Sequence, residues 1–232
     1  MLKSYLVVVV LLLCSCTHTS VEKNNKTNLL QSLDQWQNLY NDGEAKLVDG
    51  EIELISKHNW FYLTKKQYKN FILEAEVKMP SGISEYYNSG FIFRAQVRDK
   101  GDFQEAYGYQ AEVDPSDRKW SGGLYDQGRR EWLNPIHPSR SNPDEDFKQN
   151  FSPEWTMEKS NAYKADEWNQ YKIECIGSEI KIYLNGVLTT HVIDTKDAQG
   201  FIGIQHHGSK AFAETGARDN VVRFKNILIT EL

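Results

Sequence analysis

Apolar and polar residues alternate with a period of two through most of the chain, and this pattern predicts half-buried antiparallel strands. Residues 71–79 (FILEAEVKM), 90–97 (GFIFRAQV) and 107–114 (YGYQAEVD) each separate a mostly apolar face from one that carries polar side chains. They do so because successive residues of a strand point to opposite sides. In the second segment, the odd-numbered residues from Phe91 to Val97 are expected to share the apolar face.

The C-terminal half continues the same pattern, and helix-period runs are nearly absent. Asn185-Gly186 lies between two apolar runs, which is a strong signal for a two-residue hairpin with a type I′ turn. Many short strands separated by turns predict an all-β protein, a two-sheet antiparallel sandwich or jelly roll. Further strands are expected over residues 169–177, 179–193, 200–208 and 221–232.

Residues 114–166 are the one long departure from this pattern, and they include the segment WSGGLYDQGRREWLNP at 120–135. A long loop in a compact domain is usually functional or disordered, and the many aromatic residues here favour order. We expect residues 120–135 to form a lid over a groove, with the aromatic side chains packed on a sheet and Arg129 and Arg130 facing the groove. The alternative for the two arginines is that at least one is an ordinary salt-bridged anchor of the loop.

The N-terminus predicts a targeting segment. Residues 1–15 combine a lysine with a short apolar run, as in a signal peptide, and end in a bacterial lipobox that makes Cys16 the expected lipidation site. The alternative is cleavage nearby without lipid. Residues 16–28 are expected to be a flexible tether and residues 29–232 one domain. The expected location is the bacterial cell envelope, at the periplasmic face or the outer membrane.

Composition narrows the possible partners. The net charge of −5 provides no basic surplus, which argues against nucleic acid as a partner. Contact with a membrane is expected through the lipid anchor only. The six histidines show no metal-ligand spacing, so no metal site is assigned. No cofactor motif is evident, although the sequence leaves open whether a divalent metal ion assists.

Polar residues on separate predicted strands suggest a site. Glu112 and Asp114 share a strand face, and Arg94, Gln205 and His207 lie on the polar faces of other strands. If these faces belong to one concave sheet, acidic, basic and amide groups converge in a common trough. His206, which has apolar neighbours on its face, is expected to be a packing or capping residue.

Six blocks in order resemble the 3-keto-disaccharide hydrolase family: NSGFIFRAQ (88–96), YGYQAEVD (107–114), GGLYDQGRREWL (122–133), DEWNQYKIECIGSEIKIYLNGV (166–187), GFIGIQHHG (200–208) and VRFKNILITEL (222–232). The resemblance extends from about residue 30 to the end of the chain. It implies a jelly roll of the concanavalin A or laminin G type, in a secreted or lipid-anchored protein. It also implies chemistry on glycosides that carry a ketone at C3, by proton abstraction next to the ketone, elimination and hydration.

The resemblance places the family's polar positions on Arg94, Glu112, Gln205 and His207. Under this hypothesis, Glu112 and His207 are the base and the acid in either order, and Arg94 and Gln205 hold the ketone oxygen. Many relatives carry an acid and an amide as Tyr-x-Glu-x-Gln, whereas this chain has YQAEVD at 109–114, so which carboxylate acts stays open. The expected substrate-binding residues are Asp114, Trp120, Tyr125, Arg129 and Arg130.

Three alternatives remain at the level of sequence. The chain could be a non-catalytic carbohydrate-binding lipoprotein, because jelly rolls host lectins as readily as enzymes. It could be a retaining glycosidase in which Glu112 and Asp114 are the two catalytic carboxyl groups, which must lie about 5–5.5 Å apart. Alternate residues of a strand are separated by roughly twice the ~3.3 Å rise, so the distance does not exclude this alternative. It could also be an architectural lipoprotein, in which case Arg94, Glu112 and His207 would lie apart.

Overall fold

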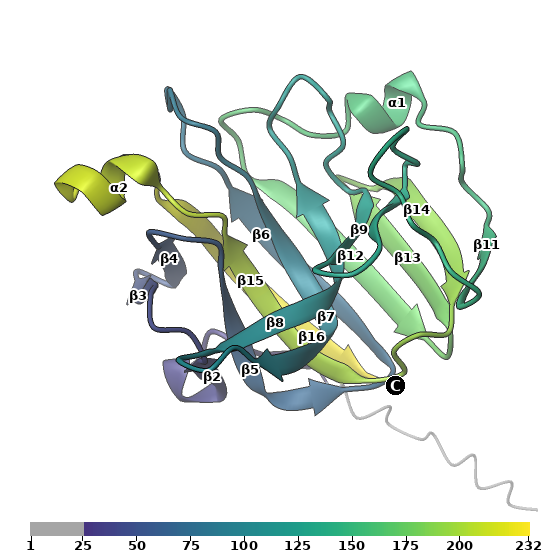
Figure 1. Ribbon diagram of the computed structural model, residues 1–232, viewed down its shortest axis with the longest axis horizontal. Coiled ribbons are helices and arrows are strands. Elements are labelled where there is room, and N and C mark those ends of the chain that lie inside the picture. Colours follow the sequence, from purple (N-terminus) through teal and green to yellow (C-terminus); the bar gives the residue numbers. More distant parts are fainter. Residues whose placement is uncertain (1–25) are drawn as a thin grey trace, which may run out of the picture.

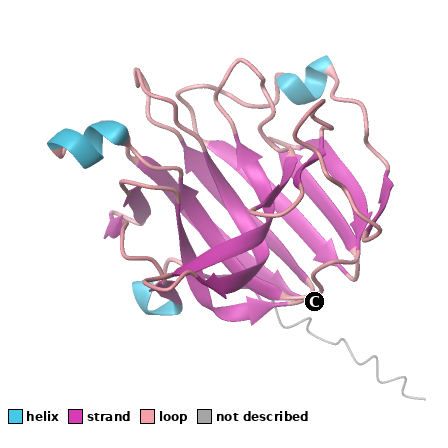
Figure 2. Cartoon of the chain, in the orientation of Figure 1, coloured by secondary structure: helices cyan, strands magenta, loops and turns pink. Residues whose placement is uncertain are grey.

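The computed structural model describes residues 26–232 as two antiparallel sheets packed face to face (Figures 1 and 2). This confirms the predicted two-sheet jelly-roll sandwich. The nine-stranded sheet has the order β11 (Phe147–Asn150), β14 (Val187–Asp194), β13 (Glu179–Leu184), β12 (Asn169–Ile176), β6 (Phe71–Lys78), β16 (Val222–Glu231), β4 (Glu51–Ile55) and β3 (Glu44–Val48), and β1 (Lys26–Asn28) also pairs with β16. Residues 26–28, expected to end the tether, therefore belong to the sheet.

The seven-stranded sheet has the order β10 (Glu131–Asn134), β9 (Leu124–Gln127), β8 (Gln104–Val113), β7 (Ser89–Asp99), β15 (Gly200–His206), β5 (Trp60–Tyr68) and β2 (Trp36–Asn38). Short helices connect strands: η1 (Leu33–Gln35), α1 (Met157–Ser160) and α2 (Lys210–Thr215). In Figure 1, α1 and α2 lie at the same end of the sandwich, far from the C-terminus. Within residues 26–232, no helix has the length and apolar character needed to cross a membrane. The predicted signal peptide and Cys16 lie outside the described residues.

The core lies between the two sheets. The apolar face predicted for residues 71–79 is buried there, and β7 and β8 contribute Phe91, Phe93 and Tyr109 from the opposite side. The ring centroid of Phe91 lies 5.1 Å from that of Tyr171 and 5.4 Å from that of Phe224. Because Tyr171 and Phe224 belong to the nine-stranded sheet, these aromatic contacts hold the two sheets together. The inward face of β8 is thus committed to the core, so its alternate residues point away from the nine-stranded sheet.

A β-bulge interrupts β7 at Arg94. The register with β8 shifts between Phe93 and Gln96, and Arg94 has a φ of 46°. One extra residue reverses the side to which the following residues point. Ala95 therefore packs with Ile92 in a second, smaller cluster on the other face. The prediction that Ala95 and Val97 share a face with Phe91 and Phe93 is wrong for this reason.

The turn between β13 and β14 confirms the hairpin predicted from Asn185-Gly186. Both residues have positive φ angles, 48° and 84°, as a type I′ turn requires. The segment 114–166 is more regular than expected, because it contains β9, β10, β11 and α1. Residues 120–135 contain the hairpin β9–β10, which extends the edge of the seven-stranded sheet. The prediction of a lid is therefore wrong.

Candidate functional site

A cavity of about 220 Å³ lies on the face of the seven-stranded sheet that points away from the core. The strand β8 provides Gln110 and Glu112, which alternate with the core residues Tyr109, Ala111 and Val113. Strands β9, β10 and β15 and the loops beside them complete it. The lining residues are Tyr86, Asn88, Gln110, Glu112, Arg118, Tyr125, Gln127, Trp132, Arg140, Gln205 and His207.

Glu112 is the buried carboxyl group of this cavity. Asn88 Nδ2 donates to Oε1 at 2.8 Å and Gln110 Nε2 donates to Oε2 at 2.9 Å. Burial, with a further contribution from the neighbouring Asp114 carboxylate, raises the pKa of Glu112 to about 8. Glu112 is therefore mostly protonated at neutral pH, and a carboxylic acid in a cavity can donate a proton.

His207 follows β15 and lines the same cavity. Its ring lies edge-on to Tyr86, with the centroids 5.2 Å apart, and burial lowers the pKa of the imidazole below its ordinary value of 6.5. His207 is therefore neutral at neutral pH and able to accept a proton. Glu112 and His207 thus have opposite proton-transfer capacities at the same pH.

Asp114 does not line the cavity. Its Oδ1 accepts from the backbone N–H of Ser116 at 3.0 Å, and its Oδ2 accepts from Arg118 Nε at 3.0 Å. Asp114 instead holds Arg118, whose guanidinium carbon lies 5.4 Å from the centre of the Trp132 ring. The Asp114 oxygens are thus engaged by the protein, which disfavours Asp114 as a nucleophile beside Glu112.

Three polar atoms of the lining side chains are buried without a hydrogen-bond partner in the described part of the chain. They are the acceptors Asn88 Oδ1 and Gln110 Oε1 and the donor Trp132 Nε1. Buried polar atoms are nearly always paired in folded proteins. A ligand with both hydroxyl donors and oxygen acceptors would satisfy all three, and sugars carry both.

The bulge in β7 excludes Arg94 from the cavity. Arg94 is completely buried, and its guanidinium donates to the carbonyl oxygens of Lys69, at 2.7 and 3.1 Å, and Asp197, at 3.2 Å. The prediction that Arg94, Glu112 and His207 share one trough is therefore wrong for Arg94. Its side chain instead bonds the turn that follows β5, at Lys69, to the loop that follows β14, at Asp197.

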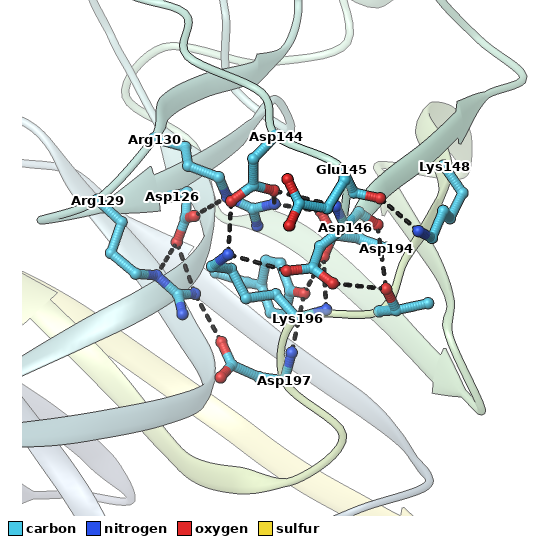
Figure 3. A network of polar contacts seen from close by, with 12 residues as sticks. Asp126, Arg129, Arg130, Asp144, Glu145, Asp146, Lys148, Asp194, Lys196 and Asp197 are labelled. Carbon is cyan, nitrogen blue, oxygen red and sulfur yellow. Dashed lines mark hydrogen bonds and ion pairs between the residues drawn. The ribbon is translucent and has the colours of Figure 1, made fainter.

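Arg129 and Arg130 belong to an ionic network rather than to the cavity (Figure 3). Arg130 pairs with Asp126, with Asp144 at 2.8 Å and with Asp194 at 2.9 Å. Arg129 donates to Asp126 at 2.8 Å and to Asp197 at 2.6 Å. Asp126 and Arg130 lie on the β9–β10 hairpin, and Asp194 ends β14 of the other sheet. The network therefore fastens the hairpin to the nine-stranded sheet. The prediction that both arginines face the groove is wrong, and the alternative of a salt-bridged loop anchor is the one that the structure has.

The remaining predicted residues divide between lining and support. Tyr125 and Gln205 line the cavity, and Trp120 packs edge-on against Trp132 with the ring centroids 4.8 Å apart. His206 is buried, with Nδ1 2.9 Å from Ser56 Oγ and Nε2 2.7 Å from the carbonyl oxygen of Asn220, as expected of a packing residue.

Sequence reasoning missed seven of the lining residues: Tyr86, Asn88, Gln110, Arg118, Gln127, Trp132 and Arg140. Gln110 carried a signal, because it is two residues before Glu112 on the same strand face. The two arginines lie in loops, where strand alternation gives no information. Arg140 donates to Tyr125 Oη at 2.9 Å and to Glu131 at 2.8 Å.

A larger cavity of about 490 Å³ lies beside β3 and β4. Among its lining residues, Arg218 donates from Nη2 to both carboxylate oxygens of Glu44, at 2.7 and 2.8 Å. None of the predicted site residues line it, so we place the site in the smaller cavity. Across residues 26–232, no group of three or more histidine, cysteine or acidic side chains is arranged to hold a metal ion.

Comparisons with known proteins agree with this fold. A family model described as the 3-keto-alpha-glucoside-1,2-lyase-like domain matches residues 26–230. Two structures from Parabacteroides distasonis, each described as a "putative glycosyl hydrolase", have TM-scores of 0.54. One is 20% identical and covers 90% of this chain and 100% of its own, and the other is 16% identical and covers 90% and 94%.

The carbohydrate binding module CBM66 from Bacillus subtilis has a TM-score of 0.50 and 14% identity, and covers 84% of this chain and 96% of its own. At these identities, the three structures show a shared fold and no more. No curated protein sequence matches the chain.

Replacing Arg130 by methionine should destabilise the protein by about 3–5 kcal/mol, because it leaves the buried carboxylate of Asp194 without a cation and leaves Asp126 with Arg129 alone. Urea denaturation measures this change. The matched control is Arg98→Met, which removes a partly exposed ion pair with Glu105 and should cost less than about 1 kcal/mol. Equal losses in the two variants would contradict the role assigned to the network.

The raised pKa of Glu112 also predicts a pH dependence of stability. Since the pKa is about 8 in the folded state and near 4.5 when exposed, the stabilisation from proton binding is complete below pH 4.5. It is lost as the pH rises to about 8. Urea denaturation at pH 5 and pH 9 should show a smaller decline for Glu112→Gln than for the wild type. The exposed substitution Glu154→Gln should keep the wild-type decline, and an unchanged decline in Glu112→Gln would refute the assignment.

Proposed function

Because the chain belongs to the 3-keto-alpha-glucoside-1,2-lyase-like family, we propose that it is an enzyme that cleaves glycosides carrying a ketone at C3. The observation that carries this proposal is that Glu112 and His207 line the same cavity. Burial favours the protonated acid in the first and the neutral base in the second. General acid–base chemistry requires such a pair near neutral pH.

The substrate fits this pair because a ketone at C3 acidifies the hydrogen at C2. In the proposed first step, His207 takes the C2 proton, and the electrons of the C–H bond form an enolate with the C3 carbonyl. The enolate then collapses, a double bond forms between C1 and C2, and the bond from C1 to the glycosidic oxygen breaks. Glu112 donates its proton to the departing oxygen, and the products are an enone and the free alcohol.

Hydration restores a saturated sugar in the second step. Water adds to C1, Glu112 as carboxylate takes a proton from it, and His207 returns its proton to C2. Both groups regain their starting protonation states, and the sum of the two steps is hydrolysis. No oxidant or reductant is consumed.

Arg118 is the group best suited to stabilise the enolate oxygen. It lines the cavity, and Asp114 engages its Nε at 3.0 Å, which leaves N–H groups of the guanidinium for a ligand. A fixed cation in a buried site stabilises developing negative charge more strongly than water does. Arg118 thus replaces Arg94 in the role that the sequence had suggested.

The competing function is carbohydrate binding without turnover. Incubation of the purified protein with a 3-keto disaccharide and with the same unoxidised disaccharide, followed by measurement of released reducing sugar, separates the two. We expect release from the 3-keto substrate only. Binding of both sugars without release would support the non-catalytic alternative.

The activity should show a bell-shaped dependence on pH. The acid limb, below 6.5, reports protonation of His207, and the alkaline limb, near 8, reports ionisation of Glu112. His207→Ala and Glu112→Gln should each lower kcat by roughly 10²–10⁴-fold, and Glu112→Gln should lose the alkaline limb. Wild-type activity in either variant would rule out the assignment.

Trp132→Phe keeps the aromatic ring but removes the unpartnered indole N–H. If that group bonds the sugar, KM should rise roughly tenfold, the value of one neutral hydrogen bond, with a smaller change in kcat. Steady-state kinetics on the 3-keto substrate measures this. Trp155→Phe is the control, because the Trp155 indole donates to the Lys119 carbonyl at 2.9 Å and lies outside the cavity lining. Equal KM values for the two variants would show that Trp132 Nε1 does not contact the ligand.

A further inference from the structure

A side chain of β8 reaches across an entire strand in the floor of the cavity. The sheet order places β7 between β8 and β15. Nevertheless, Gln110 Nε2 on β8 donates to Gln205 Oε1 on β15 at 2.8 Å. The amide of Gln110 must therefore lie over the backbone of β7.

The crossing occurs over Gly90, which is paired with Glu112 in the β7–β8 register. A Cβ atom at position 90 would lie 2.4 Å from Gln110 Nε2 and 2.8 Å from its Cδ and Cγ, and these are its three nearest contacts. Gly90 does not have a positive φ, so the backbone does not demand glycine there. Glycine is required there because the Gln110 side chain occupies the position that a Cβ atom would take.

The hydrogen bonds fix which group Gln110 presents to Glu112. Its Nε2 donates both to Gln205 Oε1 and to Glu112 Oε2, so both amide hydrogens are used. Gln205 in turn donates through its own Nε2 to Asn59 Oδ1 at 2.8 Å, which turns its oxygen toward Gln110. If the Gln110 amide were rotated, its oxygen would face two other oxygens.

We propose that Gly90 is a positioning residue, whose missing side chain leaves the gap through which Gln110 bonds Glu112 and Gln205 together. A larger residue at position 90 must displace the amide and remove the donor from Glu112 Oε2. A role for Gly90 in catalysis rests on the proposed function of Glu112. The predicted effect of Gly90 on the pKa of Glu112 is independent of that function.

Loss of this donor disfavours the carboxylate, so the pKa of Glu112 should rise. The other charged and titratable groups around Glu112 stay the same in every variant below. They are Asp114, Arg118, Arg140, His207, Tyr86, Tyr125 and Tyr171.

A double-mutant cycle tests the proposal. The full chain is prepared as wild type, Gly90→Ala, Gln110→Ala and the double variant, with ¹³C-labelled glutamate carboxyl groups. Titration followed by NMR gives the pKa of Glu112, whose resonance is identified by its loss in Glu112→Gln. No substrate is present, so the result does not depend on activity.

Gly90→Ala and Gln110→Ala should each raise the titration midpoint of Glu112 by about half a unit or more. The double variant should match Gln110→Ala alone, because the added methyl group then has no amide to displace. An unchanged midpoint in Gly90→Ala would overturn the proposal, as would additive effects. If Gly90→Ala does not fold, the proposal requires that the double variant does fold and titrates like Gln110→Ala, and failure of both to fold would overturn it.

Kinetics on the 3-keto disaccharide form a separate arm. Gly90→Ala should lower kcat about tenfold or more, change KM less, and move the alkaline limb of the pH profile upward. A wild-type protein without turnover would defeat the proposed function, whereas the NMR titration would still decide the role of Gly90.

Discussion

The burial of one carboxyl group shapes the site. Glu112 lies on the outer face of β8, whose inner face packs into the core. Its carboxyl group is therefore buried in the cavity and not between the two sheets. Burial of a charge is costly, and the group responds by retaining its proton. The amides of Asn88 and Gln110 then orient the carboxyl group, and the imidazole of His207 shares its cavity. The same desolvation that costs stability at high pH provides an acid at neutral pH.

Much of the fold follows from strand alternation. The periodicity predicted both faces of β6, the inward face of β8 and the β13–β14 turn, because these depend on local backbone geometry. The same rule failed after Phe93, where one extra residue in β7 reversed the following side chains. Nothing in GFIFRAQV distinguishes a regular strand from a bulged one, since both leave apolar residues on buried faces.

The site was predictable only in part, for a related reason. Glu112, Gln205, Tyr125 and His207 line the cavity, and strand alternation placed all of them except Tyr125 on polar faces. Arg118 and Arg140 come from loops, and their positions depend on pairing with Asp114 and Glu131, which only the folded chain brings near. Arg129 and Arg130 were wrongly predicted to face the site. Their carboxylate partners Asp197 and Asp194 lie more than sixty residues away in sequence, so the sequence does not show that these arginines are already paired.

The ionic network of Figure 3 makes the cavity wall dependent on the opposite sheet. Tyr125 and Trp132 stand on the same hairpin that Arg130 ties to Asp194, so one side of the hairpin meets the ligand space while the other is anchored at the end of β14. Residues 194–197 therefore anchor this wall of the cavity without lining it. A sequence change there can shift this wall and alter the width of the cavity while every residue that lines the cavity stays the same.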